Sequence, residues 1–149
     1  MNLYKKRFAD LSTDELYRIL QARCGVFVVE QKCAYQDLDG IDRQALHVWL
    51  EDDSKILAYL RVFAAPRLAD TIQIGRVLTT VRGQGLGEII LQAGINAIPD
   101  FFPNARSIQL EAQCYATGFY TRKGFVVTGE PFDEDGIPHV LMERPVVLP

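Results

Sequence analysis

Residues 74–87 read Ile-Gly-Arg-Val-Leu-Thr-Thr-Val-Arg-Gly-Gln-Gly-Leu-Gly, and this stretch carries more structural information than any other part of the chain. A strand-like run ends at Arg82, glycines follow at Gly83, Gly85 and Gly87, and a helical pattern begins at once. Glycine lets the backbone come close to a ligand, and a helix N-terminus adds unpaired N–H groups and a positive dipole end. The pattern predicts an anion site for a phosphate or pyrophosphate group.

The spacing of these glycines excludes two familiar phosphate-binding loops. A Walker loop needs Lys followed by Ser or Thr after the glycines, and the chain has no such pair there. A dinucleotide fingerprint needs Gly-x-Gly-x-x-Gly and an acidic residue about 20 positions later, where Pro103 and Asn104 stand instead. A tight turn before a helix is the structural alternative, and Arg82 beside the loop favours the anion site.

Composition points to an ordinary globular protein: 149 residues, 48% hydrophobic, 23% charged and a net charge of −3. This charge gives no support for a nucleic-acid partner. Because the chain lacks a long apolar run and an apolar leader, we expect no membrane partner and a cytoplasmic location. Cys24, Cys33 and Cys114 form no Cys-x-x-Cys pair, and with only two histidines we expect no metal site. Each cysteine is expected to be a small buried side chain; a catalytic thiol is the alternative.

The pattern of apolar residues predicts alternating helices and strands. Ser12 and Glu15 form a capping box that opens a helix reaching about Phe27. A polar loop is expected at Cys33–Arg43. The expected strands are Ala45–Glu51, Lys55–Ala64, Thr71–Thr79, Ser107–Ala112, Phe125–Thr128 and His139–Arg144. We also expect a helix from Leu86 to Pro99, a second helix over Tyr115–Lys123 with Gly124 at its end, and an acidic loop over Pro131–Pro138. These elements suit a mixed sheet with helices on both faces, an α/β fold.

A second motif lies in the short helix. Residues 112–125 read Ala-Gln-Cys-Tyr-Ala-Thr-Gly-Phe-Tyr-Thr-Arg-Lys-Gly-Phe, which places Tyr120 among apolar neighbours. A packed tyrosine ring leaves its hydroxyl in need of a partner. Taken alone, Tyr120 is either a core tyrosine or a catalytic group.

Together the two motifs resemble the GNAT superfamily of acyl-CoA N-acyltransferases. The cofactor motif Arg/Gln-x-x-Gly-x-Gly/Ala is matched by Arg82, Gly85 and Gly87. The later helix motif is matched by Ala116, Tyr120, Gly124 and Phe125. Gln113 stands where the family usually has Asn, a departure that weakens the transfer of that cofactor contact.

Further segments are similar to the ElaA-like branch of this superfamily: Val26–Gln31, Tyr35–Asp42 with His47, and Glu134–His139. The resemblance runs from about residue 6 to residue 145 and implies one N-acetyltransferase domain over 6–145. It also implies a single mixed, mostly antiparallel sheet of six to seven strands, flanked by helices on both faces.

The resemblance implies acetyl-CoA as acyl donor and no metal. The pyrophosphate would lie on the backbone of Arg82, Gly83, Gln84, Gly85, Leu86 and Gly87. The pantetheine arm would run beside Val77, Leu78 and Thr79, with Gln113 and Tyr120 as further contacts. The Arg82 side chain either touches a phosphate or is a solvated charge at the helix end.

The implied reaction is direct attack of a neutral primary amine on the thioester. A backbone N–H near Leu78 would stabilise the oxyanion, a contribution of about 3–4 kcal/mol. Tyr120 would protonate the departing thiolate, typically worth about 10²–10⁴-fold. The alternative role for Tyr120 is to orient the sulfur.

The acceptor side is less determined by sequence. Candidates for the general base or for substrate binding are Glu30, His47, Glu111, Glu134 and His139. Each histidine lies in an apolar strand pattern, so a structural role is its alternative. Asp37–Asp42 and Asp133–Asp135 form either an ordered acceptor site or solvated acidic loops; facing the acceptor, they would favour a cationic amine. We expect a small-molecule or peptide amine as acceptor and a possible homodimer.

Two other functions stay open. The Arg23–Phe27 pattern is also similar to acyl-homoserine-lactone synthases, although we identify no S-adenosylmethionine site. A non-catalytic acyl-CoA-binding or regulatory module is the second alternative, and Tyr120 argues against it. Because loops supply specificity on a shared fold, the acceptor cannot be named from this chain.

Overall fold

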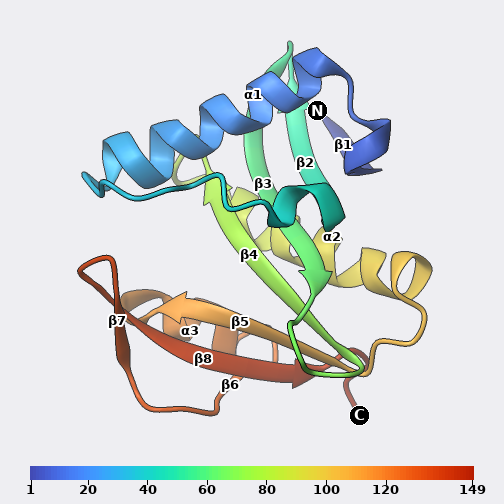
Figure 1. The fold of residues 1–149 in the computed structure, drawn as a ribbon, viewed down its shortest axis with the longest axis vertical. Coiled ribbons are helices and arrows are strands. Elements are labelled where there is room, and N and C mark those ends of the chain that lie inside the picture. The colour runs from blue at the N-terminus through green and yellow to red at the C-terminus, as the bar shows by residue number, and fades with distance from the viewer.

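The computed structural model describes residues 1–149, which form one eight-stranded sheet with helices on both faces (Figure 1). The helices are α1 (Thr13–Arg23), α2 (Leu86–Phe101) and α3 (Thr117–Thr121). The strands are β1 (Asn2–Arg7), β2 (Leu46–Asp52), β3 (Lys55–Ala64), β4 (Thr71–Thr79), β5 (Ser107–Gln113), β6 (Val126–Val127), β7 (Phe132–Glu134) and β8 (Ile137–Pro145). The strand order is β1-β2-β3-β4-β5-β8-β6, with β7 paired to β8, and only β4 and β5 run parallel.

The parallel pair decides where a site can form. β4 and β5 are paired only where Thr71–Gln73 faces Ser107–Gln109. Beyond these residues the two strands separate, so that the sheet opens like a V (Figure 1). A one-residue bulge opposite Leu60 adds to the divergence, with Arg76 in the left-handed region at φ 52°. The edge of β4 that faces β5 is therefore free of strand pairing from Ile74 onward.

Two apolar clusters hold the layers together. One lies between the sheet and α1 and includes Ile19, Trp49 and Tyr59. The larger one packs α2 and α3 against the other face. Gly94 of α2 lets this helix approach β3, because a Cβ atom there would lie 2.8 Å from the methyl carbons of Leu60. α1 thus covers one face of the β2–β4 part of the sheet, and α2 and α3 cover the other face.

The mixed α/β fold and the mostly antiparallel sheet with helices on both faces confirm the sequence prediction, although the sheet has eight strands where six to seven were expected. The capping box of α1 is present, with Ser12 Oγ accepting from Glu15 N at 3.0 Å and Glu15 accepting from Ser12 N at 2.8 Å. Three predicted strands lie within one residue of β2, β3 and β4. None of the helices combines the length and the apolar character needed to cross a membrane.

Several element predictions are wrong. The expected acidic loop Pro131–Pro138 contains β7 and a tight turn. The two turn residues, Asp135 and Gly136, both have positive φ. Pro99 does not end α2, which continues to Phe101 because proline removes a single helical hydrogen bond near the end of the helix. The first helix does not end near Phe27; it continues as a π-helical segment, η2 (Cys24–Glu30). β1 was not expected, since an edge strand with consecutive basic residues shows no alternation.

Candidate active site

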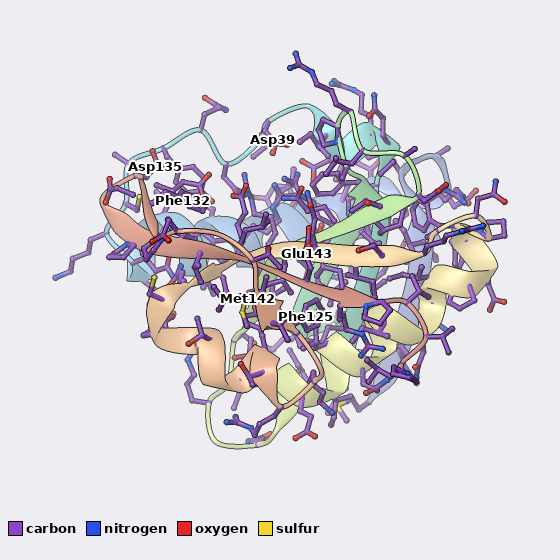
Figure 2. All side chains as sticks on the ribbon, turned by 90° about the horizontal axis from the view of Figure 1, so that it is seen from below. Asp39, Phe125, Phe132, Asp135, Met142 and Glu143 are labelled. Carbon is purple, nitrogen blue, oxygen red and sulfur yellow. The ribbon has the colours of Figure 1, made fainter.

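A cavity of about 900 Å³ fills the opening between β4 and β5. β4 supplies one wall, and β5 with the β7–β8 hairpin supplies the other. The 33–45 loop, defined as residues 33–45, and the end of η2 complete the rim. Figure 2 shows Asp39 on the loop and Asp135 on the hairpin, and both residues line the cavity.

The glycine loop lies at the start of α2 and carries free backbone donors. Gly83 has φ 76° and Gly85 has φ 69°, conformations that side-chain-bearing residues adopt at a cost. No backbone N–H of Val81–Gly85 has an acceptor in the protein, and the first N–H groups of α2 have none within the helix. Such a row of donors, joined to the positive helix end, can hold an anionic phosphate group without any charged side chain.

Arg82 lies beside this row and is already hydrogen-bonded. Its guanidinium donates to Thr79 Oγ1 at 2.7 Å, to the Thr79 carbonyl, and to Glu30 Oε1 at 2.6 Å. Both members of the Arg82–Glu30 pair are more than half exposed. Glu30 does not line the cavity, so this carboxylate is matched by Arg82 instead of facing an acceptor.

Tyr120 of α3 also lines the cavity. Its ring packs edge-on against Phe119 and Phe125, and the residue is 9% exposed. Burial raises the pKa of Tyr120 to about 12, so the hydroxyl is protonated at neutral pH. The hydroxyl has no hydrogen-bond partner within the protein, which leaves its proton free to be donated to a ligand.

Glu111, Glu134 and His139 lie on the second wall, together with Gln109 and Gln113 of β5. Cross-strand pairing sets Gln113 opposite His139 and Glu134 opposite Ile137. His139 Nδ1 donates to the Ile137 carbonyl at 2.7 Å, and its Nε2 faces Glu134 at 3.9 Å. The pKa of Glu111 is raised, because the surrounding protein partly removes this carboxyl from water and Glu134 lies beside it.

Beneath the 33–45 loop lies a network of three arginines and three aspartates: Arg23, Arg61, Arg76, Asp37, Asp39 and Asp42. Arg23, which is fully buried, joins α1 to Asp37 at 3.0 Å. Arg76 on the bulge of β4 donates to the same carboxylate at 2.8 Å. These contacts fix the loop over the cavity and lower the pKa of Asp39 to about 2, since Arg61 and Arg76 outweigh its partial burial.

His47 has no place in the cavity. It is fully buried, with Nδ1 2.8 Å from the Tyr59 hydroxyl and Nε2 2.9 Å from the Asp42 carbonyl. Burial lowers its pKa. The structure therefore separates the five acceptor-side candidates: Glu111, Glu134 and His139 share one wall, whereas Glu30 and His47 are engaged elsewhere.

Sequence reasoning did not single out Gln73 and Gln109. Gln109 Nε2 donates to Gln73 Oε1 at 3.0 Å where β4 and β5 begin to separate. The strict alternation of β5, with Gln109, Glu111 and Gln113 against an apolar face, was the signal that pointed to a polar wall. No group of three or more His, Cys, Asp or Glu side chains is arranged to hold a metal ion.

Comparison with known proteins identifies the family. The model of the acetyltransferase (GNAT) domain matches residues 10–145. This chain belongs to the GNAT acetyltransferase family. ElaA of Escherichia coli is 35% identical over 93% of both chains, and its crystal structure superposes with a TM-score of 0.89, covering 97% of this chain and 99% of that one.

Two further GNAT-fold comparisons are informative. An acyl-CoA N-acyltransferase from Pseudomonas aeruginosa is 38% identical, with a TM-score of 0.89 over 97% of this chain and 99% of that one. The acyl-homoserine-lactone synthase LasI has a TM-score of 0.76 over 98% of this chain and 90% of that one, at 14% identity. The second likeness is one of fold alone. The GNAT family and the ElaA relationship confirm the resemblance seen in the sequence.

Proposed function

We propose that this protein is an acyl-CoA-dependent N-acyltransferase that moves an acetyl group from acetyl-CoA to a primary amine. The observation that carries the proposal is the row of unpaired N–H groups at Val81–Gly85, which opens directly beside the cavity. A pyrophosphate satisfies these donors and interacts favourably with the N-terminus of α2. Acetyl-CoA supplies an activated thioester carbonyl as the electrophile.

Different residues along the cleft bind different parts of acetyl-CoA. Arg82–Gly87 hold the pyrophosphate, with Gly83, Gln84, Gly85 and Leu86 contributing backbone. The unpaired edge of β4 at Val77, Leu78 and Thr79 accommodates the pantetheine arm as an added strand. A backbone N–H near Leu78 stabilises negative charge on the carbonyl oxygen, Gln113 borders the arm, and Tyr120 donates its proton to the thiolate.

The decisive experiment measures thiol release from acetyl-CoA with a panel of amines, polyamines, amino acids and peptides. We expect turnover with at least one primary amine and a fall of about 10²–10³-fold in kcat for Tyr120→Phe. Tyr17→Phe is the matched control, because Tyr17 is 68% exposed and lies outside the cavity. Unchanged turnover in Tyr120→Phe with intact CoA binding would remove the acid role.

Two alternatives give different results in the same assay. A non-catalytic acyl-CoA-binding module binds CoA and releases no thiol with any amine of the panel. An acyl-homoserine-lactone synthase releases thiol only in the presence of S-adenosylmethionine. The polar wall of Glu111, Glu134 and His139 favours amine transfer over both.

A further inference from the structure

We propose that Arg76 is a positioning residue, whose ion pair with Asp37 ties the bulge of β4 to the 33–45 loop and so fixes the backbone that receives the acyl carbonyl. This proposal rests on the acyl-transfer function proposed above and adds to it a residue outside the glycine loop. Arg76 holds the backbone of Val77 and Leu78 in place, and its guanidinium takes no part in the bonds that form and break.

The bulge decides which face of the sheet the end of β4 meets. Arg76 and Val77 together stand opposite the single residue Leu60 of β3. Before the bulge, Ile74 enters the cluster packed by α2 and α3, and in a regular strand position 78 would enter it as well. Leu78 lies instead in the cluster beneath α1. The conformation at Arg76 therefore sets the direction of every side chain from Val77 to the end of the strand.

This conformation is an unusual one for arginine. Arg76 has φ 52°, in the left-handed region that residues with a side chain adopt at a cost. Gly75, which could adopt it freely, stands one residue earlier and has no positive φ. Strained residues persist where the surrounding structure over-determines them, and they cluster at functional sites. The contacts of the Arg76 side chain are the part of the surroundings that singles out this residue.

The Arg76 side chain is held by the 33–45 loop. Its Nε donates to Asp37 Oδ1 at 2.8 Å, and its Nη2 donates to the Asp37 carbonyl at 3.1 Å. The Tyr35 ring lies beside the guanidinium, with 5.4 Å from the ring centroid to Arg76 Cζ, and the Tyr35 hydroxyl donates to the same Oδ1 at 2.7 Å. Two directed, charged hydrogen bonds therefore fix the orientation of the guanidinium as well as its position.

Asp37 is itself fixed, so that it can serve as an anchor. Its side chain is 4% exposed, and its Oδ2 accepts from Arg23 Nε at 3.0 Å. Arg23 also donates to the Asp37 carbonyl at 3.0 Å and belongs to α1, which packs on the cluster that contains Leu78. Arg23, Asp37 and Arg76, called the bulge clamp below, thus connect α1 to the bulge by a continuous series of charged hydrogen bonds.

The bulge clamp should affect turnover more than binding. The proposed pyrophosphate contacts lie in the glycine loop, beyond the end of β4, and do not involve the Arg76 side chain. The thioester carbonyl, however, would lie against the backbone near Leu78, where a displacement of about 1 Å can cost about 10²-fold in rate. Loss of the Arg76 side chain should therefore lower kcat and leave the affinity for CoA nearly unchanged.

The test compares Arg76→Gly and Arg76→Lys with Arg67→Gly. Glycine accepts the left-handed φ and removes only the side chain, whereas lysine keeps the charge without the two directed N–H groups. Arg67 is the matched control, because it has φ 62°, is exposed and lies outside the cavity. Thermal unfolding of each variant shows that the comparison is made between folded proteins.

We expect kcat for thiol release to fall about 10–10²-fold in Arg76→Gly and about 3–10-fold in Arg76→Lys, with no change in Arg67→Gly. The dissociation constant of CoA should change less than about threefold in all three variants. If Arg76→Gly does not fold, the comparison of Arg76→Lys with wild type decides. An unchanged kcat in the Arg76 variants, or an equal loss of kcat and of CoA affinity, would overturn the positioning role.

Added guanidinium separates a tether from a charge effect. A free guanidinium ion can bond to Asp37 in Arg76→Gly, but it has no covalent link to the bulge. At concentrations far below those that unfold proteins, it should therefore leave the kcat of Arg76→Gly low. Recovery of kcat would show that Arg76 acts through its charge and would overturn the positioning role.

A further readout needs no turnover and separates the two proposals. Amide hydrogen exchange across Val77–Thr79 should be at least about tenfold faster in Arg76→Gly than in wild type or Arg67→Gly, because the bulge opens more easily. Equal exchange would overturn the bulge clamp. If exchange behaves as expected but wild type releases no thiol with any amine, acyl transfer is wrong while the bulge clamp stands. If thiol is released equally by wild type and Arg76→Gly, acyl transfer stands and Arg76 is no positioning residue.

Discussion

The two sides of the cavity are built by different means. The side that we propose for the acyl donor, called the donor side, is made of backbone: free N–H groups at Val81–Gly85, positive φ at Gly83 and Gly85, and the unpaired edge of β4. The side that we propose for the acceptor, called the acceptor side, is made of side chains, held by the buried network under the 33–45 loop and by the β7–β8 hairpin. A backbone site tolerates side-chain replacement, whereas a side-chain site depends on each charge. The difference predicts how each side responds to mutation.

The largest effect should come from Arg23→Ala on the acceptor side. Arg23 is fully buried and bridges Asp37 and Asp42, so its removal takes from each of these two buried carboxylates one of its two arginine partners. We expect a loss of about 3–5 kcal/mol in the free energy of unfolding, measured by urea titration. Arg122→Ala, at an exposed position without an ion pair, should stay within about 0.5 kcal/mol. Equal stabilities would show that the network does not hold the loop.

The next effect concerns the donor side and the conformation of its backbone. Gly85→Ala meets no neighbouring atom, but alanine at φ 69° costs about 1–2 kcal/mol. We therefore expect CoA affinity to fall about tenfold in calorimetry. Gly25→Ala is the control, because Gly25 has equally open surroundings and an ordinary φ. Similar CoA affinity in both variants would place the pyrophosphate elsewhere.

Sequence reasoning located the glycine loop at the start of α2, whereas it gave no pairing for the charged side chains on the opposite wall, and the reason is physical. Backbone geometry needs glycine, and the alternating glycines at 83, 85 and 87 leave a local signal. Partners on the other side are distant in the chain: Asp37 binds both Arg23 and Arg76, and Glu111 comes near Glu134 only after three strands have paired. Spacing along a chain does not reveal such contacts.

The same limit explains the errors in individual elements. His47 carried an ambiguous signal because a buried histidine and a catalytic one have the same strand context; in the structure it bonds to Tyr59 and Asp42 and lies outside the cavity. The Pro131–Pro138 segment has prolines at both ends and many charges, features of a loop. Its pairing with β8 converts it into a hairpin, and this hairpin supplies Glu134 and His139 to the cavity.

The pH dependence of stability sharpens the comparison further. Burial lowers the pKa of His47, whereas the unfolded chain has a value near 6.5. Above about pH 6.5 both states are neutral, and below it the unfolded state binds the proton first. The free energy of unfolding should then fall by up to about 1.4 kcal/mol per pH unit. Urea titrations at several pH values should show a shallower slope for His47→Gln, and an identical slope would contradict the structural role.

The smallest effect should come from Arg82→Ala. Arg82 and Glu30 are both largely exposed, and such pairs contribute about 0–1 kcal/mol. If the backbone carries most of the pyrophosphate contact, CoA affinity should fall only a few-fold and the difference should shrink as salt is added. If titration shows that CoA affinity falls a hundredfold or more, the donor side depends on a side chain and not mainly on its backbone.

The short seam between β4 and β5 has a mechanical consequence. Thr71–Gln73 and Ser107–Gln109 are the sole paired stretch between two halves of the sheet, which are otherwise bridged by α2 and α3 packed across the back. We expect these two halves to move relative to each other about the seam, as two plates. An acetyl-CoA molecule whose pantetheine arm hydrogen-bonds to β4 from Ile74 to Thr79 would occupy the free strand edge between β4 and β5. It would then restrict the relative motion of the two halves. Amide exchange in β4 and β5 would then slow on CoA binding, with the molecule stiffest when it is ready to react.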